Sequence, residues 1–489
     1  MPRRLLALSS ILLVVSSLCA VARAHAAGTA ATAKSPAEPT AWTSYANDNQ
    51  LRNSASSSFL TRQSVRRLTS TWTTTLDGAV YASPLAFRVA GRQLLFVATE
   101  AGSVYALDAS TGEAVWKRDL GTVTTAECGT WGITSTGVID PTRGLLFVIG
   151  ATGSLHALDL STGEESAGYP EQVVDQTAFE YVWGGLRIAG GRVYVVIASY
   201  CDVGGSDVFP EGSLKSLPLD RASGAIVWDP VPGPQNLGGI WGWGGVSIDP
   251  RDGSIFTAVG NSHVHSETCD CFVDDAGYGD SIVRLTADLS SVIDADNPGI
   301  AGTGDYDFGA APVLFQPEGC PPLAAADNKN GTLYVWNRTS LAAGPVAEIP
   351  ISDGRAAFVG TPAWSAATQT IYEAQAALFG AAGALGNGVR AFRVTAGCRF
   401  TEMWAAALGD GNQATPLVVG DVVFATGGKP GGFYALDTRN GARLWSAPTV
   451  GRTVAATITV GGSIFGADTK GTVYAFRPAP LRKSPLWLE

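Results

Sequence analysis

Four residues that lie close together in the chain could bind a metal ion. His263 and His265 are separated by one residue, and Cys269 and Cys271 follow with the same spacing. Imidazole and thiolate groups suit zinc or copper, so this cluster is compatible with either ion. A local disulfide or a different cysteine pairing is the ordinary alternative in an oxidising compartment. The sequence alone leaves these alternatives open.

A second group of residues combines an indole, an amide, a carboxylate and an amine. Trp243 lies in a glycine-rich stretch, Asn261 follows the pair Val259-Gly260, Asp275 precedes an aromatic residue, and Lys329 lies in an Asn-Lys-Asn-Gly turn. Amide and carboxylate oxygens are the ligands that Ca²⁺ prefers, and an indole offers a flat apolar face to a flat ring. The structural alternatives are a core tryptophan, a turn asparagine, a solvated acid and a surface lysine.

The composition indicates a folded, turn-rich chain. Of 489 residues, 59 are glycine, 46% are apolar and only 16% are charged, which disfavours a coiled coil or disorder. The net charge of −10 argues against a nucleic-acid partner.

The first residues have the features of an export signal. Residues 1–27 contain a basic start, an apolar run from Leu5 to Val15 and the small-x-small sequence Ala22-Arg23-Ala24. Residues 28–40 are predicted to be a disordered leader. No later stretch contains about 18 consecutive apolar residues, so no transmembrane anchor is expected. The protein is therefore predicted to be secreted or periplasmic after cleavage of its signal peptide.

A short pattern recurs along the chain: a glycine turn, a β-rich run, Ala-x-Asp and a second turn. The copies repeat on average about every 53 residues, which is enough for one four-stranded sheet. The eight copies are Gly102–Gly112, Gly153–Gly163, Gly212–Asp220, Asp280–Thr286, Gly331–Asn337, Asn387–Arg393, Gly431–Gly441 and Gly471–Arg477.

Such periodic β units predict an all-β fold, an eight-bladed β-propeller of four-stranded blades over residues 41–480, with a tail at 481–489. A solenoid is the alternative. The extra strand segment Leu68–Thr75 favours the propeller, because an N-terminal strand that closes the ring removes an exposed sheet edge.

The repeats also carry a tryptophan at a fixed distance. The pattern Ala106-x-Asp108-x-x-Thr-Gly-x-x-x-Trp116 is repeated at Asp220–Trp228 and Ala435–Trp445, and each tryptophan is expected to pack between blades. This spacing resembles the tryptophan-docking motif of the eight-bladed quinoprotein alcohol dehydrogenase superfamily. That superfamily includes pyrroloquinoline quinone (PQQ) enzymes, polyvinyl-alcohol-dehydrogenase-like proteins and non-catalytic scaffolds.

The resemblance assigns roles to five residues. It implies that Trp243 stacks under PQQ, that Lys329 contacts the quinone and that Asn261 binds Ca²⁺. Asp275 matches the acid that ligates the metal and serves as catalytic base. Asp202 matches the first calcium carboxylate only loosely.

Other parts of the family pattern are missing. The place of the two adjacent cysteines that cover PQQ reads Glu127-Cys128-Gly129, and Gly132–Thr136 lacks the arginine that contacts a PQQ carboxylate. No Cys-x-x-Cys-His motif for covalent haem is present, so oxidation would require an external electron acceptor. Two functions stay open: a PQQ- and Ca²⁺-dependent dehydrogenase of a small or polymeric alcohol, and a non-catalytic scaffold that binds a protein or a ligand.

Two further disulfides are expected from the repeat map. Cys128 and Cys201 lie near strand ends in adjacent blades, and so do Cys320 and Cys398. Both pairs are predicted to be bridged in an oxidising compartment.

Overall fold

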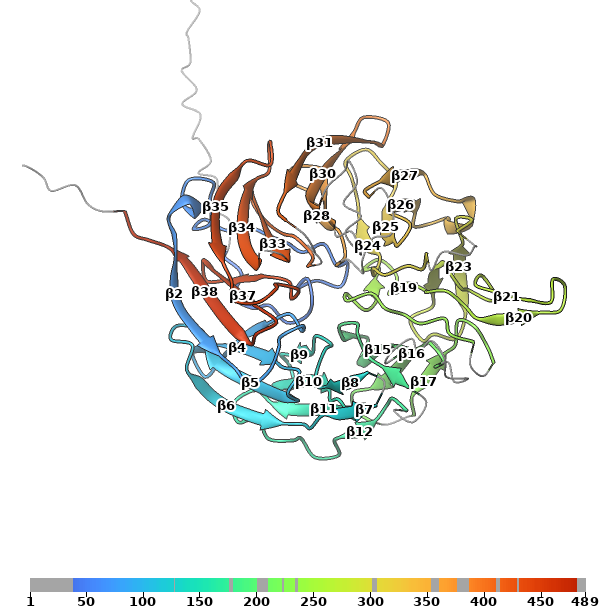
Figure 1. Cartoon of the computed structure of the whole chain (residues 1–489), viewed down its shortest axis with the longest axis horizontal. Coiled ribbons are helices and arrows are strands. Elements are labelled where there is room, and N and C mark those ends of the chain that lie inside the picture. Colours follow the sequence, from blue (N-terminus) through green and yellow to red (C-terminus); the bar gives the residue numbers. More distant parts are fainter. Residues whose placement is uncertain are drawn as a thin grey trace, which may run out of the picture. The chain divides into compact units, whose positions relative to one another are not determined.

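Small antiparallel sheets arranged around one axis make up the fold (Figure 1). The computed structural model describes residues 38–126, 128–175, 179–199, 210–221, 224–233, 236–300, 306–352, 360–375, 387–409, 414–428 and 431–481. Within these residues there are eight blades, and each contains four strands in meander order. The predicted eight-bladed all-β propeller is confirmed. The predicted signal peptide and most of the leader lie outside the described residues.

In every blade the first strand is innermost and the fourth is outermost. The strands of blades 1 to 4 are β3 (Leu85–Val89), β4 (Arg92–Ala98), β5 (Ser103–Asp108), β6 (Ala114–Asp119); β9 (Val138–Asp140), β10 (Leu145–Ile149), β11 (Ser154–Asp159), β12 (Glu171–Gln172); β14 (Arg187–Ala189), β15 (Arg192–Ser199), β16 (Ser213–Pro218), β17 (Ile226–Trp228); and β18 (Ser247–Ile248), β19 (Ile255–Ala258), β22 (Ile282–Leu285), β23 (Val292–Asp296).

The remaining blades follow the same order. The strands of blades 5 to 8 are β24 (Val313–Phe315), β25 (Leu323–Asn328), β26 (Thr332–Asn337), β27 (Ala347–Pro350); β28 (Ala363–Ser365), β29 (Thr370–Gln375), β30 (Gly388–Thr395), β31 (Arg399–Ala407); β32 (Leu417–Val419), β33 (Val422–Gly428), β34 (Gly431–Asp437), β35 (Arg443–Pro448); and β36 (Ile458–Val460), β37 (Ser463–Ala467), β38 (Thr472–Pro478), β2 (Leu68–Thr75).

Four shorter strands form two hairpins, and two more extend existing blades. The hairpins are β7 (Val123–Thr125) with β8 (Gly129–Trp131) and β20 (Val264–Ser266) with β21 (Cys271–Val273). Strand β13 (Glu180–Tyr181) pairs with β15, and β1 (Ser54–Ala55) pairs in parallel with β32.

Each of the eight repeat copies coincides with the third strand of a blade. The second strands before them are apolar on both faces, and every residue of β33 is buried, because neighbouring blades cover each sheet from two sides. The predicted closing strand is β2, which pairs with β38 from Leu68 to Thr75 and so joins the two ends of the ring. Within the described part of the chain, no helix has the length and apolar character needed to cross a membrane.

The repeated tryptophans dock between blades as expected. Trp116 on the outer strand of blade 1 donates its indole N–H to Leu160 O in blade 2, at 3.1 Å. Its ring covers Gly163, where an added Cβ would lie 2.6 Å from the ring. Trp404 makes the same contacts with Thr438 O and with Gly441. Each such tryptophan therefore fastens one blade to the turn of the next.

The segment before the closing strand lines the inner strands of the ring. The backbone oxygens of residues 43, 49, 50, 52 and 53 accept hydrogen bonds from inner-strand residues of blades 2, 4, 5, 6 and 7 in that order. Trp42 exchanges two backbone hydrogen bonds with Ala86 of blade 1. Residues 42–55 thus bind to successive blades, and we call them the axial segment.

Candidate functional site

A buried ion pair marks the boundary between blades 4 and 5. Lys329 directly follows β25, and Asp307 lies in the loop before β24. Lys329 Nζ is 2.8 Å from Asp307 Oδ1, and Lys329 N donates a hydrogen bond to Asp307 O at 3.0 Å. Both side chains are buried. The lysine that the family resemblance assigns to a cofactor is therefore held by an aspartate in this structure.

Asp280 lies two residues before β22 and interacts electrostatically with both members of this ion pair. Its side chain is 1% exposed, and Oδ1 has no hydrogen-bond partner among the described residues. Its N–H donates to Gly260 O at 3.1 Å. Burial, followed by the charges of Asp307, Asp274 and Asp275, raises the pKa of Asp280 to about 8, and Lys329 opposes this rise. Several carboxylates thus face one lysine, which leaves an excess of negative charge.

Two other predicted residues lie beside Asp280. Asn261 directly follows Gly260 and is half-buried, and its backbone oxygen accepts a hydrogen bond from Gly238 N at 3.0 Å. Asp275 is close enough to act on the charge of Asp280, but its side chain is exposed to solvent. The predicted base is therefore at the solvent side of the charged group, whereas Asp280 is at its buried side.

Trp243 is half-buried and rests on the axial segment. It packs against a buried cluster that includes Tyr45 and Leu51 of that segment. Its backbone oxygen accepts a hydrogen bond from Gly185 N at 2.9 Å. The next residue is held by Arg187, whose fully buried guanidinium donates to Gly244 O through Nε and Nη2. The indole thus has a fixed backbone and a packed apolar support.

Trp241 joins this region to a group of aromatic rings, of which the tryptophans are partly exposed and Tyr181 is buried. A Cβ added at Gly260 would lie 2.8 Å from Trp241 Nε1, so the indole nitrogen approaches the backbone just before Asn261. The ring centroids of Trp241 and Trp183 are 6.2 Å apart. Trp183 in turn contacts Trp131 at 5.3 Å and Tyr181 at 5.4 Å. This aromatic group was not found from the sequence, because its members precede the inner strands of different blades.

A buried carboxylate lies next to the aromatic group. Glu100 accepts hydrogen bonds from Thr134 Oγ1 at 2.6 Å and from Gly132 N at 2.8 Å. Burial raises the pKa of Glu100, although both hydrogen bonds oppose the shift. Thr134 lies in the stretch where the family arginine is missing, and its hydroxyl also contacts Tyr181 Oη at 2.9 Å.

The structure brings several predicted site residues together and leaves one undescribed. Asp275 and Lys329 both act on Asp280, and Asn261 adjoins Gly260, which binds Asp280. The Trp243 stretch approaches blade 5, since a Cβ at Gly242 would lie 2.3 Å from Ala311 N. Asp202 lies outside the described residues, so its predicted calcium contact stays a prediction. Among the described residues, no three His, Cys, Asp or Glu side chains are grouped so as to hold a metal ion.

Asp280 is the main residue that the sequence interpretation missed. It begins one of the weak repeat copies, at the position where the strong copies have Gly102 and Gly153. Those glycines have φ of +79° and +81°, and Asp280 adopts the same left-handed region at +53°. A side chain in a place that favours glycine is a sequence signal that could have identified it.

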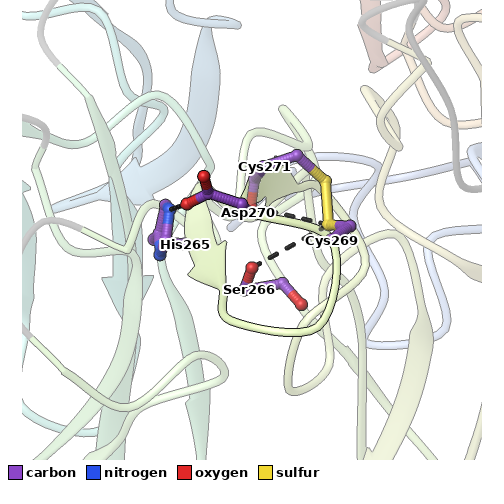
Figure 2. The surroundings of a disulfide bond; sticks show 5 residues. All are labelled: His265, Ser266, Cys269, Asp270 and Cys271. Atoms are coloured by element: carbon purple, nitrogen blue, oxygen red, sulfur yellow. Dashed lines mark hydrogen bonds and ion pairs between the residues drawn. A yellow bond between two sulfur atoms is a disulfide. The ribbon is translucent and has the colours of Figure 1, made fainter.

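The cysteines form the expected Cys320–Cys398 disulfide, which joins blades 5 and 6. Cys128 is disulfide-bonded, and its predicted partner Cys201 lies outside the described residues. Cys269 and Cys271 are bonded to each other at the tip of the β20–β21 hairpin (Figure 2).

The zinc or copper alternative for the hairpin is therefore wrong. The Cys269–Cys271 bond consumes both thiolates. His265 pairs with Phe272 across the hairpin, and His263 stacks on the Phe272 ring. Both imidazoles therefore lie on the same side of the hairpin as the Phe272 side chain. Cys271 precedes Phe272 and pairs with Ser266, which places it on the opposite face.

Two stretches of the chain match known protein families. Residues 42–178 match the family described as glucose/ethanol/alcohol dehydrogenase, beta-propeller domain, and residues 360–480 match the outer membrane protein assembly factor BamB. The polyvinylalcohol dehydrogenase of a Pseudomonas species is 25% identical over 390 residues, which cover 72% of this chain and 51% of that protein. The Sphingopyxis enzyme of the same name is 26% identical over 438 residues, which cover 77% of this chain and 62% of that protein. The chain thus spans roughly half to three fifths of these relatives.

Solved propellers share the fold. The quinohemoprotein alcohol dehydrogenase of Comamonas testosteroni superposes with a TM-score of 0.70 at 16% identity, over 92% of this chain and 82% of that one. A europium-containing methanol dehydrogenase gives 0.70 at 15% identity, over 90% and 98% of the two chains. The chain thus carries matches to PQQ-repeat family models, is similar to polyvinylalcohol dehydrogenases and shares the propeller fold of the quinoprotein alcohol dehydrogenases. In this propeller, the site described above lies at blades 4 and 5.

Proposed function

We propose that the protein is an exported PQQ- and Ca²⁺-dependent dehydrogenase that oxidises an alcohol or a polymeric alcohol. The observation that carries the proposal is the grouping of Lys329, Asp307 and Asp280 with Asp275 beside Asn261. The relatives named polyvinylalcohol dehydrogenase support a polymeric alcohol as substrate. The predicted signal peptide supports export to the periplasm or the medium.

Oxygen donors of the kind that a hard cation prefers lie in this region. Asp280 has a buried carboxylate oxygen without a partner, and the acids around it outnumber the one lysine. A divalent cation would neutralise this excess and would lower the pKa of Asp280. Asn261 and Asp275 would supply amide and carboxylate oxygens, and Asp202 would complete the set.

PQQ, when bound, would accept the hydride of the alcohol. Trp243 offers a half-buried indole face supported by the axial segment, which suits a flat ring. Lys329 is a buried cation beside Asp307, and it would polarise a quinone oxygen if PQQ bound there. Asp275 would take the proton of the substrate hydroxyl, because an ionised carboxylate beside a cation can act as base at neutral pH.

Reconstitution tests the proposal directly. Purified protein is incubated with PQQ and CaCl₂, and the quinone absorbance, Trp243 fluorescence and dye-linked oxidation of polyvinyl alcohol are recorded. We expect quinone binding and turnover in the wild type, and binding with strongly reduced turnover in Asp275→Asn. If the fluorescence change on adding PQQ is lost in Trp243→Phe, the indole of Trp243 is the group that stacks on the quinone. Failure of the wild type to bind the quinone or to oxidise any alcohol would refute the proposal.

A non-catalytic scaffold is the second candidate. It is favoured by the match of residues 360–480 to an assembly factor and by the engagement of Lys329 with Asp307. The missing adjacent cysteines and the missing arginine point the same way. A wild-type protein without quinone binding, but with a protein or ligand that binds at the axial opening, would support this function.

A further inference from the structure

The β20–β21 hairpin is an insertion that leaves the candidate site and returns to it. It begins after Asn261 and ends before Asp275, and it connects β19 to β22 where blades 1, 2, 5, 7 and 8 have a short turn. Figure 1 shows that it extends outward from blade 4 beyond the neighbouring strands. Within the described residues, β20 and β21 pair only with each other. At the base of the hairpin, His263 N donates to Asn236 O at 2.9 Å and Ser262 forms a bridge with Leu237, so the edge is covered there.

Several contacts brace the hairpin, whereas an isolated two-stranded sheet is only marginally stable. Cys269–Cys271 closes the tip, and His265 Nε2 lies 3.2 Å from Asp270 Oδ1 (Figure 2). His263 stacks on Phe272 with ring centroids 4.1 Å apart. At the base, Ser262 N donates to Asp274 O at 2.7 Å. These contacts fix the shape of the hairpin in advance, which lowers the entropy cost of binding a partner.

The hairpin segment combines an exposed aromatic side chain with several acidic residues. Phe272 is 59% exposed. Residues 262–275 contain four acids, at 267, 270, 274 and 275, and no lysine or arginine. An aromatic centre with a charged rim is typical of protein interfaces. The sign of the charge selects a partner with a basic face.

We propose that this hairpin face is the docking surface for a small electron-carrier protein with a basic face. The inference rests on the proposed dehydrogenase function. Oxidation of an alcohol to a carbonyl releases two electrons and two protons, so each turnover reduces two one-electron carriers and releases the protons to water. The proposed oxidation needs an electron acceptor, and the sequence given holds no Cys-x-x-Cys-His motif for covalent haem. The hairpin belongs to the segment between Asn261 and Asp275, so a carrier bound to it would contact the segment that joins these two site residues.

Mitochondrial cytochrome c, a small basic haem protein, serves as the probe. Its binding to the wild type is measured by calorimetry at low and high salt, with no alcohol present. We expect Phe272→Ser to weaken binding about tenfold, which corresponds to the loss of one interface anchor. We expect Glu267→Lys with Asp270→Lys to abolish the salt dependence as well as most of the affinity. Turnover with a small dye as acceptor should not change in these variants.

Matched controls use exposed residues outside the hairpin. Phe59→Ser removes a phenyl ring that is 51% exposed, and Asp288→Lys reverses an exposed acid in the β22–β23 turn. Neither should alter binding. The proposal is overturned if the wild type does not bind the probe, if the hairpin variants bind it normally or if the controls lose affinity equally. If the wild type is a dimer and Phe272→Ser dissociates it, the partner of this surface is a second copy of the chain and the electron-carrier proposal is overturned.

The binding measurement separates this inference from the function on which it rests. If the probe binds through the hairpin but the protein oxidises no alcohol, the docking proposal is retained and the proposed dehydrogenase function is refuted. If the protein oxidises an alcohol with the dye but the hairpin does not contribute to probe binding, the dehydrogenase function is retained and the docking proposal is refuted.

Discussion

At the scale of single residues, Asp280 shows where the candidate site departs from ordinary propeller structure. A left-handed backbone costs an aspartate more than a glycine, and a buried carboxylate without a partner costs more again. Asp280 combines both features beside Lys329 and Asp307. Costs of this kind are found mainly at functional sites, where the surrounding structure sustains them.

The raised pKa of Asp280 gives a pH-dependent prediction. Its pKa is about 8 in the folded protein against an ordinary 3.8. Below pH 4 the carboxyl is neutral in both the folded and the unfolded state. As the pH rises from 4 towards 8, the unfolded state ionises more readily, so the free energy of unfolding falls. We expect Asp280→Asn to become progressively more stable than the wild type over this range, by up to about 1.4 kcal/mol per pH unit, and to keep a constant advantage above it. Urea unfolding at several pH values measures the difference.

Added Ca²⁺ supplies the control for this series. A bound cation favours the ionised carboxylate, so the advantage of Asp280→Asn should shrink when CaCl₂ is present. Asp288→Asn, at an exposed acid, should show no such rise with pH. A stability difference for Asp280→Asn that stays constant between pH 4 and 8 would contradict the prediction.

The Lys329–Asp307 ion pair gives a second prediction at this scale. Lys329→Met leaves Asp307 buried without its cation, and we expect it to lower the free energy of unfolding by about 3 to 5 kcal/mol. The double variant Lys329→Met with Asp307→Asn should recover part of that loss, because neither partner is then charged. Denaturant unfolding of both variants gives the coupling energy. Additive losses would show that the two residues act independently.

At the scale of elements, the strands were more predictable than the site. The third strand of each blade was found because a glycine turn, a β-rich run and a second turn are all local in the sequence, and the closing strand Leu68–Thr75 was found because it lacked a copy of its own. Lys329 and Asn261 were found through their turns. The Lys329–Asp307 ion pair, the charge interaction of Asp280 with it and the support of Trp243 by the axial segment could not be predicted, because each joins elements that are separate in the sequence.

The turn beneath a docked tryptophan is a testable element. Gly163 has φ of +73° and lies under the Trp116 ring, so Gly163→Ala must accept both a strained backbone and a steric clash. Gly91→Ala is the matched control, since Gly91 has φ of +84° but no atom within 4 Å of an added Cβ. We expect Gly163→Ala to lose roughly 1 to 3 kcal/mol more than Gly91→Ala in thermal or urea unfolding. Equal losses would mean that the ring contact is unimportant.

At the scale of the whole molecule, two disulfides of very different span allow a comparison. Cys320–Cys398 closes a loop of 78 residues and joins two blades, whereas Cys269–Cys271 closes a loop within one hairpin. The chain-entropy argument assigns about 4.5 kcal/mol to the first and about 1.5 kcal/mol to the second. We therefore expect the double serine variant of Cys320 and Cys398 to unfold at clearly lower urea concentration than that of Cys269 and Cys271. The reverse order would show that local geometry outweighs loop length.

The axial segment has a consequence for how the chain reaches its native state. Tyr45 bonds to Thr415 across 370 residues, and Asn53 bonds to Pro416 across 363. A growing chain that has made these first residues must therefore wait for nearly the whole of its length before their partners exist. Contacts of such long range slow folding. The part of the protein that is synthesised first is thus among the last to be secured, and until then the inner edges of the blades stay open to wrong pairing.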